Sequence, residues 1–323
     1  MYEVTGIGNA IVDILANVND DFLLSHNLDK SVMYLTETDK QQLILKDLND
    51  IKIVSGGSVG NTIATLSQLG VSSAFLGQTS NDTWGKSFEK DMEDIGVFTS
   101  LNVIEDNTLA SGTSVILITP DGERTMNTNL GVSSLIDSQS IDEKVLTNSK
   151  ILYIEGYLFD TNDSKNAIRR SINLSKSNNT KIALSLSDAF CVERHHDDFL
   201  ELLKDVDILF ANEAEICSLL RIPNQELTTE EIENVKNQLP AICAITQSDR
   251  GAIVISKEEV FSVDTTPIFS PQDLTGAGDQ FAAGFIFGLV NDWSHNDCAK
   301  YGIELASRII ARIGSRFEKK ELN

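Results

Sequence analysis

Near its C-terminal end the chain carries Asp273-Leu-Thr-Gly-Ala-Gly-Asp-Gln-Phe-Ala-Ala-Gly284, the stretch from which most of its interpretation follows. Gly276 and Gly278 are separated by one small residue, Ala277, and are followed by Asp279 and an apolar run. Glycines allow a tight turn, so that successive N–H groups and the positive end of a following helix converge on one point. The pattern therefore predicts an anion-binding turn that opens a helix, with Asp279 in its first turn.

A carboxylate at this position has two possible roles. Close to an anion-binding turn, Asp279 can accept a proton from an attacking hydroxyl group and act as a general base. Acidic side chains are also favoured in the first turn of a helix simply because of the helix dipole. The spacing alone does not separate the two roles, so both stay open at this point.

Short β-branched runs alternate with helix-length apolar patterns through the second half of the chain. The expected strands are residues 2–7, 151–154, 181–186, 207–210 and 241–246, and the expected helices are 59–69, 163–177, 196–204, 213–220, a helix ending near 290, and 297–313. This alternation predicts an α/β fold with a mostly parallel sheet covered on both faces. In such sheets, ligands bind beyond the carboxyl ends of the strands. A hairpin with strands 113–119 and 123–127 is expected around the turn at 120–122.

Composition excludes several classes of function. The chain has 48 Asp and Glu against 26 Lys and Arg, a formal net charge of −22, which opposes binding to nucleic acid or to anionic membranes. It contains no apolar run of the roughly 18 residues that a membrane span needs, and its first residues do not resemble a secretion signal. The four cysteines are scattered without metal-ligand spacing. These features predict a cytoplasmic protein that acts on small molecules, without nucleic-acid or membrane partners and without a structural metal.

Four motifs, in order, resemble the ribokinase (PfkB) superfamily of carbohydrate and nucleoside kinases. They are Gly56-Gly-Ser-Val-Gly-Asn61, Asn212-Glu-Ala-Glu215, Thr246-Gln-Ser-Asp-Arg-Gly251 and the stretch 273–284. The resemblance covers nearly the whole chain. It implies a ribokinase-like three-layer α/β/α sandwich with a mostly parallel central sheet, formed by a single domain of residues 1–323. It also implies a small, discontinuous β lid, built from about residues 12–40 and 108–130.

The resemblance also implies roles for individual residues. The catalytic residues would be Asp279 as general base, the backbone of Gly276, Ala277 and Gly278 as the site that stabilises the transferring phosphoryl group, and Arg124 of the lid. ATP would be contacted by Asn212, Thr246, Gly251, Thr275, Gly276 and Gly278, and Mg²⁺ would be held through water by Asn212 and Glu215. The protein would be a monomer or a homodimer.

Four further stretches are similar to the adenosine kinase branch of the superfamily, namely 8–13, 119–131, 154–160 and 185–191. They imply phosphorylation of the 5'-hydroxyl of adenosine, with AMP and ADP as products. The acceptor would be bound by Asn9, Asp13, Gly57, Ser58 and Asn61, and Tyr157 or Phe159 would stack on adenine. Carboxylate and amide groups suit paired hydroxyls, because together they accept and donate hydrogen bonds.

Other interpretations remain open. The chain could be a sugar kinase of the same superfamily for ribose, fructose or 2-keto-3-deoxygluconate, or a nucleoside- or sugar-binding sensor without catalysis. Asp13, Asn61 and Arg124 could also be an ordinary strand-end carboxylate, a helix-face amide and an exposed strand arginine. The chain departs from the family pattern at Leu274, where Thr or Val is common, and at Gly60, where Ala or Gln is common.

Overall fold

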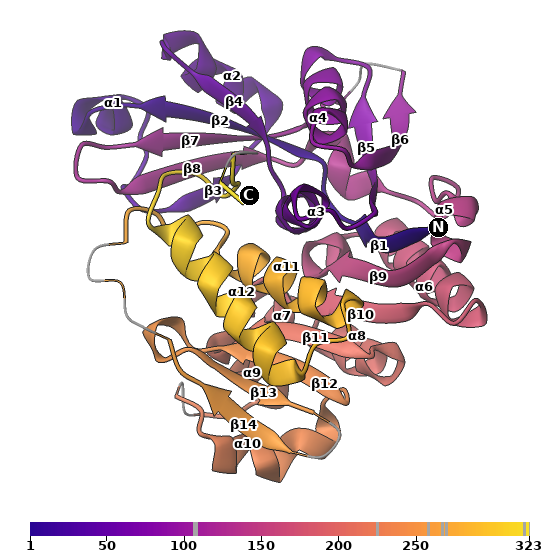
Figure 1. The fold of residues 1–323 in the computed structure, drawn as a ribbon. Coiled ribbons are helices and arrows are strands. Elements are labelled where there is room, and N and C mark those ends of the chain that lie inside the picture. The colour runs from indigo at the N-terminus through magenta and orange to yellow at the C-terminus, as the bar shows by residue number, and fades with distance from the viewer. Residues whose placement is uncertain are drawn as a thin grey trace.

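Two β-sheets organise the chain, and Figure 1 shows them joined side by side. The computed structural model describes residues 1–105, 109–223, 226–256, 259–265, 268, 271–318 and 321–322. The larger sheet has nine strands. They are β1 (Tyr2–Ile7), β5 (Ser73–Ser80), β6 (Phe98–Ile104), β9 (Ser149–Glu155), β10 (Lys181–Ser185), β11 (Ile208–Asn212), β12 (Ile242–Thr246), β13 (Ala252–Ile255) and β14 (Val260–Val263).

The strand order of this large sheet is β14-β13-β12-β11-β10-β9-β1-β5-β6. The strands from β12 to β6 are all parallel, and β13 and β14 extend the sheet as antiparallel strands. In β1, Val4 pairs with Ser73 on one side and with Ile151 on the other. Because the strands are parallel, their carboxyl ends meet along one edge, where ligands bind in sheets of this kind.

Helices cover both faces of the large sheet. One face carries α3 (Ser58–Gln68), α4 (Thr83–Asp94), α11 (Ala277–Val290) and α12 (His295–Ile310), which pack in one hydrophobic cluster. The other face carries α5 (Glu143–Thr147), α6 (Asn162–Ser177), α7 (Ala189–Arg194), α8 (His196–Leu202), α9 (Glu213–Leu220) and α10 (Thr229–Val235), with a second cluster. The predicted three-layer α/β/α sandwich with a mostly parallel central sheet is therefore confirmed.

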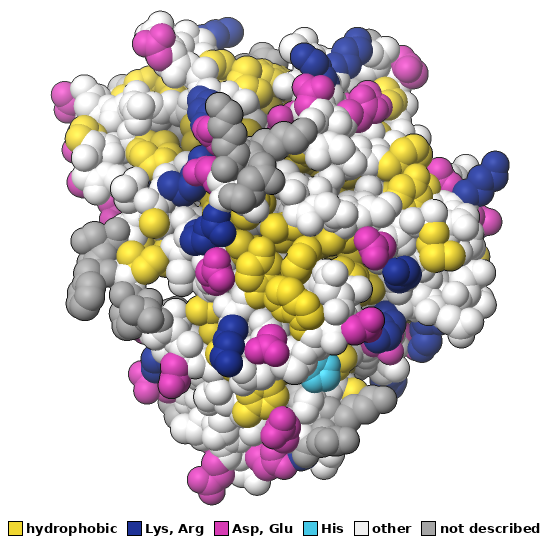
Figure 2. Space-filling model, viewed as in Figure 1, with side chains coloured by type: hydrophobic (Ala, Val, Ile, Leu, Met, Phe, Trp, Pro, Cys, Tyr) yellow, Lys and Arg dark blue, Asp and Glu magenta, His cyan; other side chains and the backbone are white. Residues whose placement is uncertain are grey.

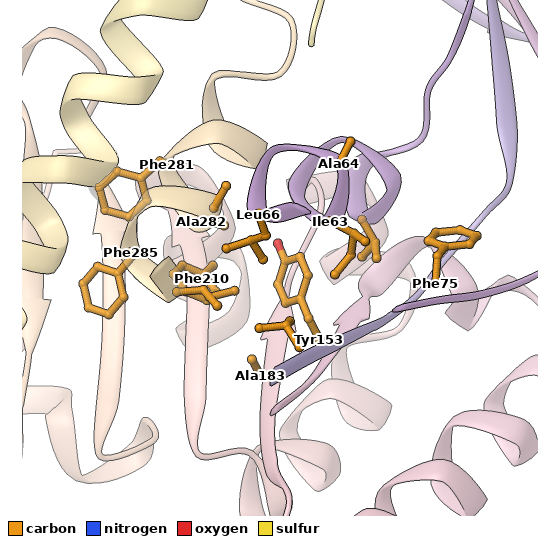
Figure 3. Close-up of a cluster of buried hydrophobic side chains, with 14 of the residues drawn as sticks. Ile63, Ala64, Leu66, Phe75, Tyr153, Ala183, Phe210, Phe281, Ala282 and Phe285 are labelled. Carbon is orange, nitrogen blue, oxygen red and sulfur yellow. The ribbon is translucent and has the colours of Figure 1, made fainter. Parts of the chain in front are cut away.

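The first of these clusters lies beneath α3 and α11, the helices that carry the motifs at 56–61 and 273–284. Figure 3 shows Tyr153 and Phe210 of the sheet beside Ile63 of α3 and Phe285 of α11. The ring centroids of Phe210 and Phe285 are 5.6 Å apart in an edge-to-face contact. Fully burying a side chain of this size contributes about 1.5–3 kcal/mol. Apolar packing therefore contributes to holding α3 and α11 in place relative to each other, in addition to the polar contacts between them.

The second sheet has five strands in the order β3-β8-β7-β2-β4. They are β2 (Ile11–Asn17), β3 (Met33–Leu35), β4 (Lys52–Ser55), β7 (Gly112–Ile118) and β8 (Arg124–Asn129), accompanied by α1 (Asp20–Ser25) and α2 (Thr38–Asp47). Strands β7 and β8 form the expected hairpin. Strand β4 lies outside the two ranges expected for the lid, and residue 108 of the second range lies outside the described residues. Movement of this sheet as a lid remains a prediction.

The two sheets are connected by short segments. Strand β1 continues into β2 after residues 8–10, and β4 leads into α3 through Gly56 and Gly57. No helix among the described residues is both long and apolar enough to cross a membrane. On the face in Figure 2, the Lys and Arg side chains are interspersed with Asp and Glu.

Candidate active site

A cavity of about 710 Å³ lies at the carboxyl ends of the parallel strands and is bounded on one side by the second sheet. Most of the residues expected to bind ligands line it. They are Asn9, Asp13, Gly57, Ser58, Asn61, Tyr157, Asn212, Glu215, Thr246, Thr275, Gly276, Ala277, Gly278 and Asp279. The sequence motifs, which are far apart along the chain, therefore meet in one place. Arg124 and Gly251 do not line this cavity.

The turn before α11 has the geometry that its glycines predict. Gly276 has φ of +81° and caps the helix, and a Cβ atom there would lie 2.8 Å from the Cβ atom of Ser315. A side chain at this position would be strained by both its backbone conformation and its neighbour. A Cβ atom at Gly278 would meet no atom within 4 Å, so the space in front of the turn is open. The free N–H groups at the start of α11 suit a phosphate in that space.

Asp279 lies in the first turn of α11, and two donors from α3 hold its carboxylate. Ser58 Oγ donates to Oδ1 at 2.6 Å, and Asn61 Nδ2 donates to Oδ2 at 2.8 Å. Burial raises the pKa of Asp279 to about 6, although these two hydrogen bonds and the positive charge of Arg316 lower it. The group is thus ionised at neutral pH with a pKa close to the working range of a general base.

Three side chains on one face of α3 donate hydrogen bonds to Asp279. Ser58, Asn61 and Thr62 are three and four residues apart, which places them on one side of the helix. Thr62 Oγ1 donates to the backbone oxygen of Asp279 at 3.1 Å. Ser58 and Asn61 were expected to contact the acceptor, and that role remains a prediction. Their hydrogen bonds in the structure are to Asp279.

Asp13 presents a carboxylate to the cavity. It is buried, and none of the described residues donates a hydrogen bond to this group. A Cβ atom at Gly56 would lie 2.5 Å from the carboxyl carbon, so only glycine allows this close approach. Burial raises the pKa of Asp13 to about 7, and the charges of Arg316 and Arg124 oppose this rise. Asp13 is therefore free to accept hydrogen bonds from the hydroxyl groups of a ligand.

Glu155, at the end of β9, is a residue of the site that the sequence motifs did not predict. Its Oε1 atom accepts hydrogen bonds from the backbone N–H of Asn9 at 3.2 Å and from Asn9 Nδ2 at 2.5 Å, and its Oε2 atom accepts one from the backbone N–H of Val59 at 3.2 Å. Burial raises the pKa of Glu155 to about 7. The carboxyl group orients the Asn9 amide in the cavity. An acidic residue directly after the apolar run 151–154 was the signal that could have identified it.

Arg124 does not face the main cavity. It pairs with Asp273, with Nη2 2.6 Å from Oδ2, and both side chains are at least 90% buried. Its Nη1 atom lies 3.5 Å from Thr275 Oγ1. This pair joins β8 of the second sheet to the turn before α11. A contact between Arg124 and the phosphates, as the sequence predicts, therefore requires this ion pair to open.

Asn212 and Glu215 are already bonded to each other at the start of α9. Asn212 Oδ1 accepts from the Glu215 N–H at 2.9 Å, and Glu215 Oε2 accepts from the Asn212 N–H at 3.0 Å. Asn212 Nδ2 also donates to Glu215 Oε1 at 2.7 Å. Among the described residues, no group of three His, Cys, Asp or Glu side chains could hold a metal ion. The expected role of this pair in holding Mg²⁺ through water remains a prediction.

The aromatic residues divide between cavity and core. Tyr157 lines the cavity, and its hydroxyl donates to the Ser187 carbonyl at 3.4 Å. Phe159 is 1% exposed and packs against Phe199, with ring centroids 4.8 Å apart, so it does not reach the cavity. Phe190, at the start of α7, was missed in the sequence although it lines the cavity and is 75% exposed.

The two remaining nucleotide-site candidates lie at the end of β12. Thr246 lines the cavity. Gly251 has φ of +94° and lies in the turn between β12 and β13, outside the cavity lining. The expected contact of Gly251 with the nucleotide remains a prediction.

Comparison with known families defines the class of protein. Residues 28–321 match the pfkB family of carbohydrate kinases, and the chain belongs to this family. It is a kinase with an alcohol group as phosphoryl acceptor. It is similar to adenosine kinase 2 of Arabidopsis thaliana, with 26% identity over 98% of this chain and 95% of that protein. It is also similar to the 5-dehydro-2-deoxygluconokinase of Clostridium botulinum (strain Eklund 17B / Type B), with 24% identity over 83% of this chain and 81% of that protein.

Solved structures give the same class. The adenosine kinase from Sinorhizobium meliloti matches with a TM-score of 0.87 and 35% identity, covering 98% of this chain and 96% of that one. A probable sugar kinase from Rhizobium etli CFN 42 matches with a TM-score of 0.86 and 34% identity, covering 98% of this chain and 94% of that one. The predicted ribokinase-like fold and the resemblance to adenosine kinases are both confirmed.

Proposed function

We propose that the protein transfers the γ-phosphoryl group of ATP to the 5'-hydroxyl of adenosine, giving AMP and ADP. The observation that carries this proposal is the position of Asp279. Its carboxylate is held by Ser58 and Asn61 beside the turn at 276–278, in the same cavity as the free carboxylate of Asp13. A base, an anion site and an acceptor site are thereby adjacent, as direct transfer between two bound substrates requires.

The chemical step follows from this arrangement. The 5'-oxygen of the acceptor forms a bond to the γ-phosphorus while the bond from that phosphorus to the β,γ-bridging oxygen breaks. Asp279 takes the proton of the hydroxyl group, which it can do because it is ionised above a pH of about 6. The N–H groups of the turn at 276–278 stabilise the charge on the transferring group.

Mg²⁺ would supply charge neutralisation on the phosphates of ATP. Asn212 and Glu215 would orient water bound to that ion. Their mutual hydrogen bonds hold both side chains in place for this role. This arrangement keeps the Glu215 carboxyl at the cavity wall without requiring it to bind the ion directly.

The lining of the cavity supports a nucleoside as acceptor. Asn9 and Asp13 suit the ribose hydroxyls, because an amide and a carboxylate can donate to and accept from a pair of hydroxyls. The second sheet and the residue that follows β8 add an apolar wall to the same cavity, formed by Ile11, Met33, Leu35, Met126 and Leu130. A purine base would cover this wall, whereas a free sugar would leave it in contact with water.

Closure of the second sheet over the ligands completes the proposal. Met33 and Leu35 line the cavity and yet are 51% and 61% exposed. Leu274, on the opposite wall, is 67% exposed. Movement of the sheet toward the ligands would bury these side chains and exclude water from the reacting groups, which suppresses hydrolysis of ATP.

A sugar kinase is the second candidate. The similarity to the probable sugar kinase from Rhizobium etli and to the clostridial 5-dehydro-2-deoxygluconokinase favours it. The turn at 276–278 and Asp279 would have the same roles in this reaction, and only the acceptor would differ.

An acceptor panel tests the proposal. Purified protein with Mg-ATP would be assayed for ADP release with adenosine, other nucleosides, ribose, fructose and 2-keto-3-deoxygluconate, and the phosphorylated product identified by chromatography. We expect the highest kcat/KM with adenosine, with AMP as product. Turnover of a free sugar without turnover of adenosine would establish the second candidate. Tight nucleoside binding without turnover of any acceptor would indicate a sensor.

A further inference from the structure

Arg316 is a buried cation in the segment after α12, which returns to the junction between the two sheets (Figure 1). Its side chain is 8% exposed. Nε donates to Asn61 Oδ1 at 2.8 Å, Nη2 donates to the Gly56 carbonyl at 3.1 Å, and Nη1 donates to Ser55 Oγ. Nη1 also lies 3.6 Å from Asp91 Oδ2. The guanidinium group thus joins the end of β4, the start of α3 and α4.

The contact with Asn61 sets the direction of its amide group. Oδ1 of Asn61 accepts from Arg316 Nε and from Ser315 Oγ, so Nδ2 is turned toward Asp279. A flipped amide would place its oxygen against the Asp279 carboxylate and its N–H₂ group against the guanidinium. Both contacts would then be repulsive, because two acceptors and two donors would face each other. Arg316 therefore specifies the orientation in which Asn61 donates to Asp279.

The space for the guanidinium comes from Gly60. A Cβ atom at this position would lie 3.0 Å from Arg316 Nη2, closer than ordinary van der Waals contact. Burial lowers the pKa of Arg316 to about 10, so the group is still charged at neutral pH. The charged guanidinium group therefore fits next to α3 because residue 60 of that helix is a glycine and has no side chain.

The charged and titratable groups that face Asp279 come from three parts of the structure. Asp13 belongs to β2, Tyr153 and Glu155 belong to β9, and Arg316 belongs to the segment after α12. Asp279 raises the pKa of Asp13 and of Glu155 in addition to the effect of burial. Arg316 is the cation of this group, and its charge favours the ionised form of Asp279.

We propose that Arg316 is a positioning residue for phosphoryl transfer, which fixes the Asn61 amide that orients Asp279 and places a positive charge behind this base. The proposal rests on the proposed role of Asp279 as general base. Through its contacts with Ser55 and Asn61, Arg316 also links the end of β4, where the second sheet meets α3, to the orientation of Asp279.

Two variants separate the two parts of this role. Arg316→Met removes both the hydrogen bonds and the charge, whereas Arg316→Lys keeps the charge but not the fixed set of donors. Arg312→Met is the matched control, because Arg312 lies in the same segment and pairs with Glu321 rather than with Asn61. The measurement is kcat, KM and the pH dependence of kcat at saturating substrates, with whichever acceptor the wild-type enzyme phosphorylates.

We expect Arg316→Met to lower kcat by about 10- to 100-fold with little change in KM for ATP, and to move the acid limb of the pH profile up by about one pH unit, as the loss of a nearby opposite charge requires. Arg316→Lys should lower kcat and leave the acid limb near its wild-type pH. Arg312→Met should keep kcat within about twofold of the wild-type value and leave the acid limb at its wild-type pH.

Wild-type kcat and an unmoved limb in folded Arg316→Met would overturn the proposal, as would an equal loss in Arg312→Met. If Arg316→Met does not fold, an unchanged kcat in Arg316→Lys would overturn it. A wild-type enzyme that phosphorylates a sugar instead of adenosine would overturn the proposed acceptor, and the effect of Arg316 would still be measured with that sugar.

Discussion

Replacement of Asp13 by asparagine is expected to stabilise the protein while impairing catalysis. The side chain is buried without a hydrogen-bond donor among the described residues, and burial raises its pKa from 3.8 to about 7. At about 1.4 kcal/mol per pKa unit, this rise corresponds to about 4 kcal/mol against the ionised form. A buried asparagine amide without partners costs about 1–3 kcal/mol itself. We therefore expect a net gain of about 2 kcal/mol in the free energy of unfolding at pH 8.

The pH dependence of this gain has a defined sign. The folded state binds the Asp13 proton more tightly than the unfolded state does, so the wild-type protein loses stability as the pH rises from about 4 through about 7. Asparagine has no such titration. The advantage of Asp13→Asn should therefore be about 2 kcal/mol at pH 8 and close to zero at pH 5.5, where the ionisation cost of Asp13 has fallen to about that of the asparagine amide.

Urea unfolding of the ligand-free protein at both pH values measures the effect, with Asp94→Asn as control, because Asp94 is exposed on α4. The control should change stability by less than about 0.5 kcal/mol. Asp13→Asn should also lower kcat/KM for the acceptor by about 100-fold, since two charge-assisted hydrogen bonds are lost. An unchanged or lower stability of Asp13→Asn at pH 8 would show that the Asp13 carboxylate carries no burial penalty, contrary to this prediction.

Three further results are expected. With saturating substrates, the acid limb of kcat should lie near pH 6, because Asp279 must be ionised to accept a proton and its pKa is about 6; a limb near pH 4 would contradict this. Arg124→Gln should lower the free energy of unfolding by about 3 kcal/mol, because it removes the cation that pairs with buried Asp273 and leaves that carboxylate, among the described residues, with only the backbone N–H groups of Thr275 and Gly314; a loss below 1 kcal/mol, on the order of an exposed pair, would argue against this. Gly276→Ala should lower kcat by at least about 10-fold by distorting the turn, and normal kinetics would show that the turn tolerates a Cβ atom.

The architecture was predictable where the local sequence determines it. Buried parallel strands are continuous apolar runs, and the run 151–154 forms the centre of β9 (Ser149–Glu155). The turn chemistry at 120–122 predicted the hairpin of β7 and β8 to within two residues at each end. Strand β4 was missed, because it is a four-residue edge strand whose first two residues are exposed. Helix α7 was missed as well, since six residues give too short a pattern to detect.

The site was predictable in its motifs and not in its supporting contacts. The turn at 276–278 is a local pattern, so its position at the start of a helix and next to Asp279 could be inferred from spacing. The hydrogen bond from Arg316 to Asn61 joins residues 255 positions apart, and no local pattern indicates it. The partner of Arg124 was equally hidden, because its pairing with Asp273 depends on how the second sheet packs against the turn.

The turnover of Asp279→Asn tests most directly whether Asp279 is the catalytic base. The variant would be compared with the wild-type enzyme under saturating Mg-ATP and acceptor, with thermal unfolding as a check on its fold. We expect an intact fold and a kcat lower by a factor of about 10² to 10⁴, because the group that accepts the hydroxyl proton is lost. Near-normal turnover in a folded Asp279→Asn protein would contradict the assignment of this carboxylate as the catalytic base.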